Sequence, residues 1–456
     1  MTAAALAEAV GGMIVGDPEA SATSFTIDSR VLEPGACFVA LQGERDGHDF
    51  VGDAFARGAQ IALVARPLDH PIGTALVVVD DPLAALARAA AHQRRQWCDV
   101  TVVGITGSAG KTSTKDLTAA ALTPDRRVHA SFGSFNNEAG LPLTMLAVPP
   151  GTDVVVAEMG ARFPGNIAAL CAVAEPTVGV VTHIGLAHAE HLGGRDGIVK
   201  TKGELVEALP ASGIAVLNAD DEATPLLAAR TEARVLTVGT GAKADVAVAD
   251  LELDAELRPR FTVASPWGAL PVALGVRGAH QAQNAAMAAT VALALGVAPE
   301  QVARGLAEAA SASWRMELET SPGGILVLND AYNASPTSMR AALESFGRLA
   351  APGRRVAVLG DMLELGEHAE AEHAALGSLA ATVGIDLLVA VGPHSAVTAT
   401  HAERAGVVVL VAADREEAHA AVGAHVRPGD AVLVKASRAV GLEVLADALA
   451  RGEHDA

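Results

Sequence analysis

The sequence has little cysteine, few aromatic residues and a shortage of positive charge. Its three cysteines, Cys37, Cys98 and Cys171, are too far apart in 456 residues to form a metal-binding pair, so we expect a reducing compartment. Lys and Arg number 33 against 53 Asp and Glu, a formal net charge of −20. This balance argues against a nucleic-acid partner, because phosphate backbones are bound by Lys and Arg.

The chain also lacks the patterns of export and membrane insertion. Its N-terminus, MTAAALAEAV, has no basic segment followed by an apolar one. The closest approach to a membrane span is QAQNAAMAATVALALGVAP, whose amides and many alanines make a poor span. We therefore expect a cytoplasmic protein with no membrane insertion, and a monomer as the simplest state.

The length and the strand patterns predict an α/β protein of three domains. Residues 1–97 contain short strand-like runs (CFVAL, IALVA, ALVVV) and Ala-rich helices. Residues 98–311 alternate strand runs with helices, which is typical of a mostly parallel sheet, and residues 244–276 suggest an antiparallel addition. Residues 312–456 repeat strand and helix regularly, which predicts a doubly wound, Rossmann-like domain with its ligand at the carboxyl ends of the strands.

The stretch TGSAGKTST has the composition of a phosphate-binding loop. It follows the strand-like run DVTVVGIT and precedes a helical pattern. Gly107 and Gly110 would let backbone N–H groups approach a phosphate at a helix N-terminus. Lys111 would reach the β- and γ-phosphates, and the hydroxyl of Thr112 would bind Mg²⁺. The loop departs from the standard pattern, which has glycine where Ile105 stands, and the alternative is a simple turn before a helix.

Acidic and imidazole side chains follow the next two strands. Glu158 ends the run DVVVAEMG, where a magnesium-binding carboxylate is expected beside a phosphate loop; the alternative is an ordinary strand-end charge. His183, His188 and His191 follow TVGVVTHIG. Zinc is one reading of these histidines, although no cysteine joins them, and exposed or capping histidines are another.

Two lysines, Lys200 and Lys202, lie in VKTKGELVEAL. We expect them at the start of a helix, where positive charge opposes the helix dipole. At least one of them would then have a specific role, and the alternative is a pair of solvated surface lysines.

Taken in order, these motifs resemble the Mur ligases, the ATP-dependent enzymes that build the peptide of bacterial peptidoglycan. The resemblance covers essentially the whole chain in the same three-domain order. It rests on the ordered set TGSAGKTS, Glu158, AHAEHLG, KGEL, NADD, GAHQAQN, WRME, NDAYNASP, GDMLELG and VKASR. Within the family, SFNNEAGLP, the pair NDAYNASP and GDMLELG, and the missing Asp-Asn-Pro-Arg motif favour a dipeptide-adding member over an amino-acid-adding one.

The resemblance implies ATP and Mg²⁺ as cofactors, and UDP-N-acetylmuramoyl-tripeptide and D-alanyl-D-alanine as substrates. The implied reaction forms an amide bond through an acyl phosphate. The positions that match the family's ATP site are Gly107, Ser108, Ala109, Gly110, Lys111, Thr112, Ser113, Asn284, Arg315, Asp330 and Tyr332. The implied metal ligands are Thr112, Glu158, His188 and a carbamylated Lys202, and the implied catalytic residues are Lys111, Lys202, His188 and Glu158.

The same resemblance assigns the two other substrate sites. It makes residues 1–97 the UDP-substrate domain, residues 98–311 the ATP-binding domain and residues 312–456 the acceptor domain. The residues implied for the UDP-substrate are Asp28, Ser29, Arg30, Gly43, Arg45, Asp46, Gly47, His48, Asn136 and Asn137. Those implied for the acceptor are Asn333, Ser335, Lys435, Ser437 and Arg438. One departure is Gln281, because the family has asparagine directly after the histidine of GAHQ.

Three other functions fit parts of the pattern. A P-loop switch or motor gives no reason for the first domain. A folylpolyglutamate synthetase shares the acyl-phosphate chemistry, but such a chain starts near its phosphate loop, whereas a whole block precedes the loop here. A nucleotide-binding scaffold without catalysis would not need the metal and lysine positions, which are intact.

Overall fold

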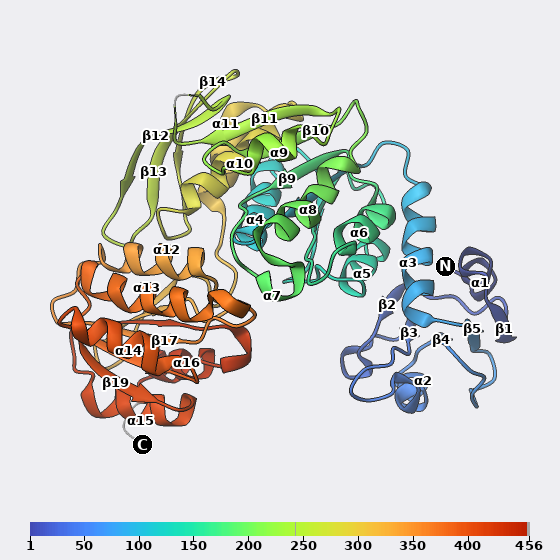
Figure 1. Ribbon diagram of the computed structural model, residues 1–456. Coiled ribbons are helices and arrows are strands. Elements are labelled where there is room, and N and C mark those ends of the chain that lie inside the picture. The colour runs from blue at the N-terminus through green and yellow to red at the C-terminus, as the bar shows by residue number, and fades with distance from the viewer. Residues whose placement is uncertain (242, 454–456) are drawn as a thin grey trace.

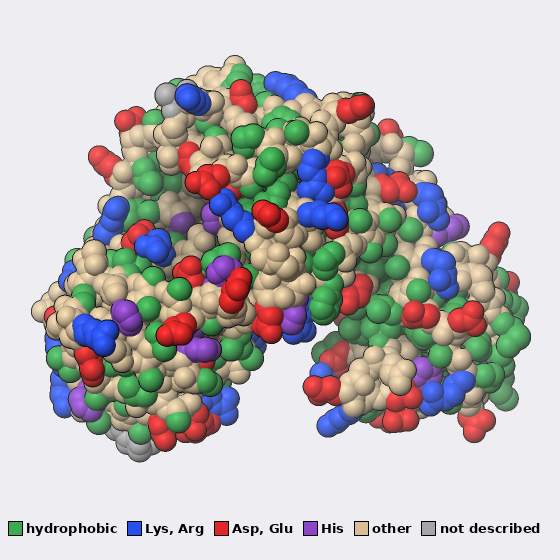
Figure 2. Space-filling model, in the orientation of Figure 1, with side chains coloured by type: hydrophobic (Ala, Val, Ile, Leu, Met, Phe, Trp, Pro, Cys, Tyr) green, Lys and Arg blue, Asp and Glu red, His purple; other side chains and the backbone are tan. Residues whose placement is uncertain are grey.

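The computed structural model describes residues 1–241 and 243–453. Within these residues the chain forms three β-sheets, each covered by helices and following one another along the sequence. The N-terminal and C-terminal parts flank the central part, and the space-filling view shows a wide gap between them (Figures 1 and 2). The predicted α/β class with three sheet-containing regions is confirmed.

The first sheet has five strands, and only β1 and β5, which pair at one edge, run antiparallel to each other. Its order is β1 (Met13–Gly16), β5 (Ala75–Val78), β4 (Ile61–Val64), β3 (Ala36–Val39) and β2 (Ser24–Thr26). The helices of this part are α1 (Ala3–Val10), α2 (Val51–Ala56) and α3 (Pro82–Arg95), with the 3₁₀ turns η1 (Ser29–Val31) and η2 (Gly47–Phe50). Helix α3 joins this part to the central one, because the buried Arg94 donates to the carbonyl of Ala174 at 2.9 Å.

The central sheet has nine strands, parallel except where β12, β13 and β14 pair. Its order is β14 (Gly268–Ala273), β13 (Pro259–Ser265), β12 (Val246–Leu253), β11 (Arg234–Gly239), β10 (Ile214–Asn218), β9 (Val178–Val181), β6 (Thr101–Thr106), β8 (Val154–Glu158) and β7 (Val128–Ala130). The antiparallel addition predicted for residues 244–276 is therefore confirmed. Strands β6, β8 and β9 are buried on both faces, which is why they read as continuous apolar runs.

Helices cover both faces of the central sheet. One face is packed by α4 (Lys111–Leu122), α10 (Gln281–Ala294) and α11 (Pro299–Glu308). The other carries α5 (Gly140–Leu146), α6 (Asn166–Ala174) and α8 (Gly194–Glu207), and the short helices are α7 (Ala189–Leu192) and α9 (Thr224–Ala228). Because α8 already begins at Gly194, Lys200 and Lys202 lie in the helix interior. The expectation that they stand at a helix start is wrong, and the dipole argument for them fails.

The third sheet has six strands, parallel except for its edge strand β15. Its order is β15 (Glu317–Thr320), β16 (Leu326–Asn329), β20 (Ala431–Lys435), β17 (Arg355–Gly360), β18 (Leu387–Val391) and β19 (Val408–Ala412). Its helices are α12 (Pro336–Phe346), α13 (Ala369–Thr382), α14 (Ser395–Arg404), α15 (Arg415–His425) and α16 (Glu443–Arg451), with the turns η3 (Gly366–His368) and η4 (Arg438–Val440). The carboxyl ends of β16, β20 and β17 lie side by side and carry the predicted motifs.

The predicted domain limits at 97/98 and 311/312 fall between elements, respectively after α3 and after α11; the limits themselves stay predictions. Over the residues that the structure describes, no helix is long and apolar enough to cross a membrane.

Candidate active site

The predicted phosphate-binding loop, TGSAGKTST, connects β6 to α4. At two of its positions the backbone conformation and the close neighbours allow only glycine. Gly107 has φ +149°, and a Cβ there would lie 2.0 Å from Oγ1 of Thr182. Gly110 has φ +80°, and a Cβ would lie 2.7 Å from Oδ1 of Asn284. The loop is held to the segment just after β9, because the N–H of Ser108 donates to the carbonyl of His183 at 2.7 Å. The backbone therefore approaches its neighbours as closely as a phosphate-binding loop must.

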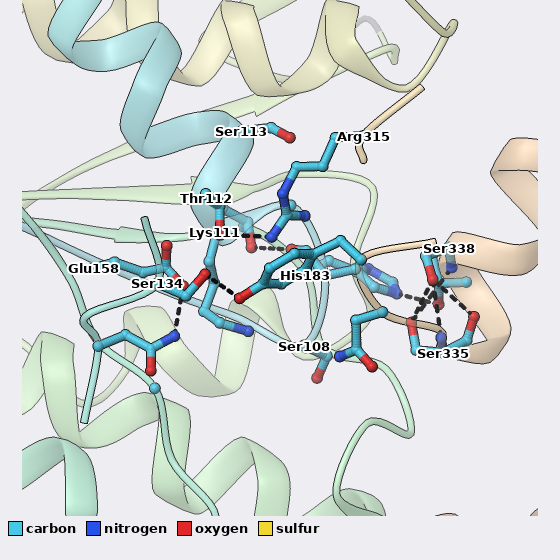
Figure 3. A pocket seen from close by; sticks show the side chains of 18 of the residues that line it. Ser108, Lys111, Thr112, Ser113, Ser134, Glu158, His183, Arg315, Ser335 and Ser338 are labelled. Atoms are coloured by element: carbon cyan, nitrogen blue, oxygen red, sulfur yellow. Dashed lines mark hydrogen bonds between the residues drawn. The ribbon is translucent and has the colours of Figure 1, made fainter. Parts of the chain in front are cut away.

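Two positive side chains, Lys111 and Arg315, lie at the start of α4 (Figure 3). Lys111 Nζ donates to the carbonyl of Gly107 at 2.8 Å. Arg315, from the connection to the third sheet, donates to Oγ1 of Thr112 at 2.9 Å. Its guanidinium also stacks on Tyr332, 4.2 Å from the ring centroid. Burial lowers the pKa of Lys111, and the Arg315 charge lowers it further while Glu158 opposes the change. An anion bound here would relieve the repulsion between these cations.

Glu158 has a carboxylate oxygen with no partner. One of its oxygens accepts from Asn136 Nδ2 at 2.7 Å, whereas Oε2 is buried without a hydrogen bond. A buried carboxylate oxygen without a partner carries a large desolvation cost. Glu158 and Thr112 line the same cavity, and carboxylate and hydroxyl oxygens are the kind of ligand that magnesium prefers. These residues fit a magnesium ion.

Lys202 lies fully inside the protein beneath this site. It is only 1% exposed, and burial lowers its pKa well below the ordinary value, with the charge of Lys111 acting in the same direction. A lysine of lowered pKa holds a larger share of neutral amine, the form that reacts with CO₂ to give a carbamate. Lys200, in contrast, is exposed on the same helix, as the surface reading expects.

The three predicted histidines separate into two groups. His183 contacts Asp221 through Nδ1 at 3.1 Å and Thr337 through Nε2 at 3.1 Å. His188 is hydrogen-bonded through Nδ1 to Glu364, and His191 lies 3.7 Å from the same carboxylate. Among residues 1–241 and 243–453, no group of three or more His, Cys, Asp or Glu side chains is arranged to hold a metal. The zinc reading therefore gains no support.

Asn284, which the resemblance assigns to the ATP site, lies against the loop. Its Nδ2 donates to Oε1 of Gln281 at 3.0 Å, and Gln281 in turn approaches the hydroxyl of Ser113 at 3.4 Å. The glutamine that departs from the family pattern thus holds the asparagine and connects it to α4.

The lysine and arginine predicted for the acceptor carboxylate are engaged by other groups. Lys435 is buried and donates to Asp330 Oδ2 at 2.6 Å and to the carbonyl of Asn333 at 2.9 Å. Arg438 pairs with Glu443 at 3.0 Å and stacks on Trp314 at 4.6 Å. The Lys435 ammonium is thus buried in contacts within the protein, whereas the Arg438 side chain is half exposed.

The two serines of the same prediction, Ser335 and Ser437, accept hydrogen bonds from backbone N–H groups. Ser437 Oγ accepts from the N–H of Leu363 at 2.9 Å. Ser335 caps α12, where it accepts from the N–H of Ser338. These four residues hold the strand-end loops in this structure, and their assignment to the acceptor stays a prediction.

The two motifs predicted for the UDP-substrate follow adjacent parallel strands, β2 and β3. Asp28 begins η1 and pairs with Arg30 at 2.7 Å, while Ser29 is buried between them. Asp46 precedes η2 in a turn that also contains Gly43, Arg45 and Gly47. Its carboxylate contacts His48, and Nε2 of His48 accepts from the N–H of Ala65 at 2.8 Å. These side-chain contacts fix the conformation of both motifs, which lie at the carboxyl ends of β2 and β3.

A cavity of about 740 Å³ brings most of the other predicted residues together. It is lined by the predicted phosphate-binding loop, by Glu158, His183 and His188, and by loops of the third sheet. The predicted residues in its wall are Ser108, Ala109, Gly110, Lys111, Thr112, Ser113, Asn136, Asn137, Glu158, His188, Asn284, Arg315, Asp330, Tyr332, Asn333, Ser335 and Lys435. The cavity is not lined by the first-sheet motifs, nor by Gly107, Lys202, Ser437 and Arg438. Asn137, which does line it, also accepts a hydrogen bond from the N–H of Gly140 at the start of α5.

Several residues of the wall were not predicted. Ser134 forms a hydrogen bond with the hydroxyl of Tyr332, and Thr182 Oγ1 donates to the carbonyl of Ala109 at 2.6 Å. Arg162 pairs with Glu364 at 2.8 Å. Glu364 itself does not line the cavity. Its position just past a strand of the doubly wound block could have marked it as a candidate, whereas Ser134 and Arg162 lie in irregular loops that give no such signal.

Comparison with known proteins places this site in a family. Residues 22–94 match the model described as "Mur ligase family, catalytic domain", residues 105–292 match "Mur ligase middle domain", and residues 314–438 match "Mur ligase, glutamate ligase domain". The chain belongs to the Mur ligase family.

Several relatives match over nearly the whole chain. A UDP-N-acetylmuramoyl-tripeptide–D-alanyl-D-alanine ligase from Mycobacterium tuberculosis is 43% identical over 98% of this chain and 97% of its own. A crystal structure of MurF from Acinetobacter baumannii matches with a TM-score of 0.87 and 32% identity over 98% of both chains. The MurF ligase of Thermotoga maritima, solved in complex with ADP, matches with a TM-score of 0.79 and 30% identity over 94% of this chain and 97% of its own.

Proposed function

We propose that this protein is an ATP-dependent ligase that joins D-alanyl-D-alanine to UDP-N-acetylmuramoyl-tripeptide in the cytoplasmic synthesis of peptidoglycan precursors. The products are UDP-N-acetylmuramoyl-pentapeptide, ADP and phosphate. The observation that carries the proposal is that Lys111, Thr112, Arg315 and Glu158 line the same cavity, and that one carboxylate oxygen of Glu158 is buried without a hydrogen-bond partner. The names of the relatives, at up to 43% identity over the full chain, support the choice of substrates.

The site explains how an acid would be activated. The tripeptide carboxylate attacks the γ-phosphate of ATP, which gives an acyl phosphate and ADP. Lys111 and Arg315 offset the negative charge that gathers on the transferred phosphoryl group. The amine of the acceptor then attacks the acyl carbon, and phosphate leaves from the tetrahedral intermediate.

A metal site follows from the same residues. Thr112, Glu158, His188 and a carbamate on Lys202 would hold Mg²⁺, which when bound neutralises charge on the phosphate oxygens. A carbamate supplies a carboxylate where an ammonium would repel the ion. The low pKa of the buried Lys202 supports this modification.

The three parts of the chain divide the work. Residues 1–97 would bind the UDP-substrate through the Asp28 and Asp46 turns, residues 98–311 would bind ATP, and residues 312–456 would bind the acceptor. Because Arg315 and Tyr332 belong to the last part and the loop to the central one, docking of the two parts completes the nucleotide site.

Phosphate release tests the proposal. The protein is incubated with ATP, Mg²⁺, UDP-N-acetylmuramoyl-tripeptide and D-alanyl-D-alanine, and each component is left out in turn. We expect phosphate only when all are present. Release that needs no acid and no amine would point to a switch or motor, and release with a single amino acid on a shorter nucleotide substrate would point to another Mur ligase.

A further inference from the structure

Glu364 joins the third part of the chain to the central part through one carboxylate. It lies in the loop between β17 and η3. Its carboxylate is 2.8 Å from the guanidinium of Arg162, 3.7 Å from His191 and in hydrogen-bond contact with Nδ1 of His188. Its own backbone carbonyl accepts from the N–H of Glu190 at 3.3 Å. All four partners belong to the central part.

The loop that carries Glu364 is held from several sides. The N–H of Met362 donates to His373 Nε2 at 3.1 Å, and the N–H of Leu363 donates to Ser437 Oγ at 2.9 Å. Just before them, the buried carboxylate of Asp361 accepts from the N–H of His394 at 3.1 Å. These contacts leave the loop little freedom.

Glu364 itself has a left-handed backbone, with φ +60°. This conformation is sterically unfavourable for a residue with a Cβ. Such a conformation persists only where the surroundings impose it, and it is most frequent at functional sites. The side chain is therefore placed toward the central part by the fold of the loop.

The hydrogen bond to Glu364 determines the tautomer of His188. An ionised carboxylate only accepts hydrogen bonds, so Nδ1 of His188 must carry the proton. In a neutral imidazole the other nitrogen, Nε2, then keeps its lone pair. His188 lines the same cavity as Lys111 and Glu158. Metal-binding histidines commonly donate their second N–H to a carboxylate in this manner.

We propose that Glu364 is a positioning residue that holds His188 with Nε2 ready for the metal, so that docking of the third part completes the metal site. This inference rests on the proposed function, in which His188 is a magnesium ligand. Arg162 contacts the Glu364 carboxylate and keeps it oriented. Glu364 is not itself a metal ligand in this proposal.

The test measures metal binding without turnover. Mn²⁺ serves as the probe, and its binding to the full-length protein with ADP present is followed by electron paramagnetic resonance. Glu364→Ala should weaken Mn²⁺ binding by about 10- to 100-fold, the effect expected when such an outer partner is removed. Glu364→Gln should recover part of the loss, because its amide oxygen can accept the same hydrogen bond. Glu367→Ala is the matched control, since that side chain is 90% exposed, and it should bind like the wild type.

A second readout follows the imidazole directly. In ¹⁵N NMR of histidine-labelled protein, the His188 signal is assigned by its loss in His188→Gln, and we expect the Nδ1–H tautomer in the wild type. In Glu364→Ala the signal should change to a tautomer mixture. Unchanged Mn²⁺ affinity in a folded Glu364→Ala protein, or a tautomer that does not respond, would overturn the inference and leave the ligase function standing. Failure of the wild type to bind Mn²⁺ or release phosphate would overturn both.

Discussion

Replacing Lys111 by methionine should separate catalysis from folding. The Lys111 ammonium lies 2.8 Å from the loop carbonyl of Gly107, at the place proposed for the γ-phosphate. Two unit charges about 4 Å apart interact by about 4 kcal/mol at an effective dielectric constant of about 20. If this stabilisation acts on the transferred phosphoryl group, its loss corresponds to about 10³-fold in turnover. Methionine keeps most of the side-chain volume, so packing changes little.

The thermal stability of Lys111→Met should stay the same or rise, although its turnover falls. Burial lowers the pKa of Lys111 below 10.5, so the folded protein binds this proton less tightly than the unfolded chain does. Stability therefore rises with pH between the lowered pKa and 10.5, and the charged form costs stability at pH 7. We expect Lys111→Met to melt no lower than the wild type at pH 7, while ADP release falls about 10³-fold. Near-normal ADP release from a folded Lys111→Met protein would refute the assignment of the phosphate loop.

Three further predictions concern the lysine, the loop and the acceptor. Lys202→Ala should be nearly inactive in ADP release and partly restored by a small added carboxylate, whereas Lys200→Ala, changed at the exposed lysine of the same helix, should be normal; full activity of Lys202→Ala without CO₂ would exclude the carbamate. Gly110→Ala should weaken ADP binding measured by calorimetry, because its Cβ would lie 2.7 Å from Asn284, and Gly165→Ala, at a similar φ but with open space around it, should bind ADP normally. D-alanyl-D-alanine should support phosphate release far better than D-alanine, L-lysine or diaminopimelate, because Asn333 and Thr337 present polar neutral groups to the cavity while Lys435 is paired with Asp330; a preference for lysine or diaminopimelate would make this chain an amino-acid-adding ligase.

The sequence predicted those parts of the site that lie in local motifs. Lys111, Thr112 and Glu158 were found because each follows a buried strand, and the strand ends of a parallel sheet meet at one edge. Arg315 and Asp330 were found through the resemblance to the family, and they do line the same cavity. The long central strands were also predicted, since burial on both faces gives continuous apolar runs.

The parts that were missed depend on the order of strands and on contacts between distant segments. The contact between Lys435 and Asp330 is one example, because β20 lies beside β16 and brings the Lys435 ammonium to the Asp330 carboxylate. Sequence alone does not give that order. Glu364 meets His188 only because two parts of the chain dock, 176 residues apart in sequence. Short strands such as β2 and the edge strand β15 were missed because a few residues carry no clear period.

The most direct test of the central claim follows an oxygen atom. UDP-N-acetylmuramoyl-tripeptide is prepared with ¹⁸O in both oxygens of its terminal carboxylate and is incubated with the protein, ATP, Mg²⁺ and D-alanyl-D-alanine. If the carboxylate attacks the γ-phosphate, mass spectrometry will find one ¹⁸O in each released phosphate and one in the new amide of the pentapeptide product. Phosphate that contains no ¹⁸O would show that the acid is not activated as an acyl phosphate, and it would contradict the account.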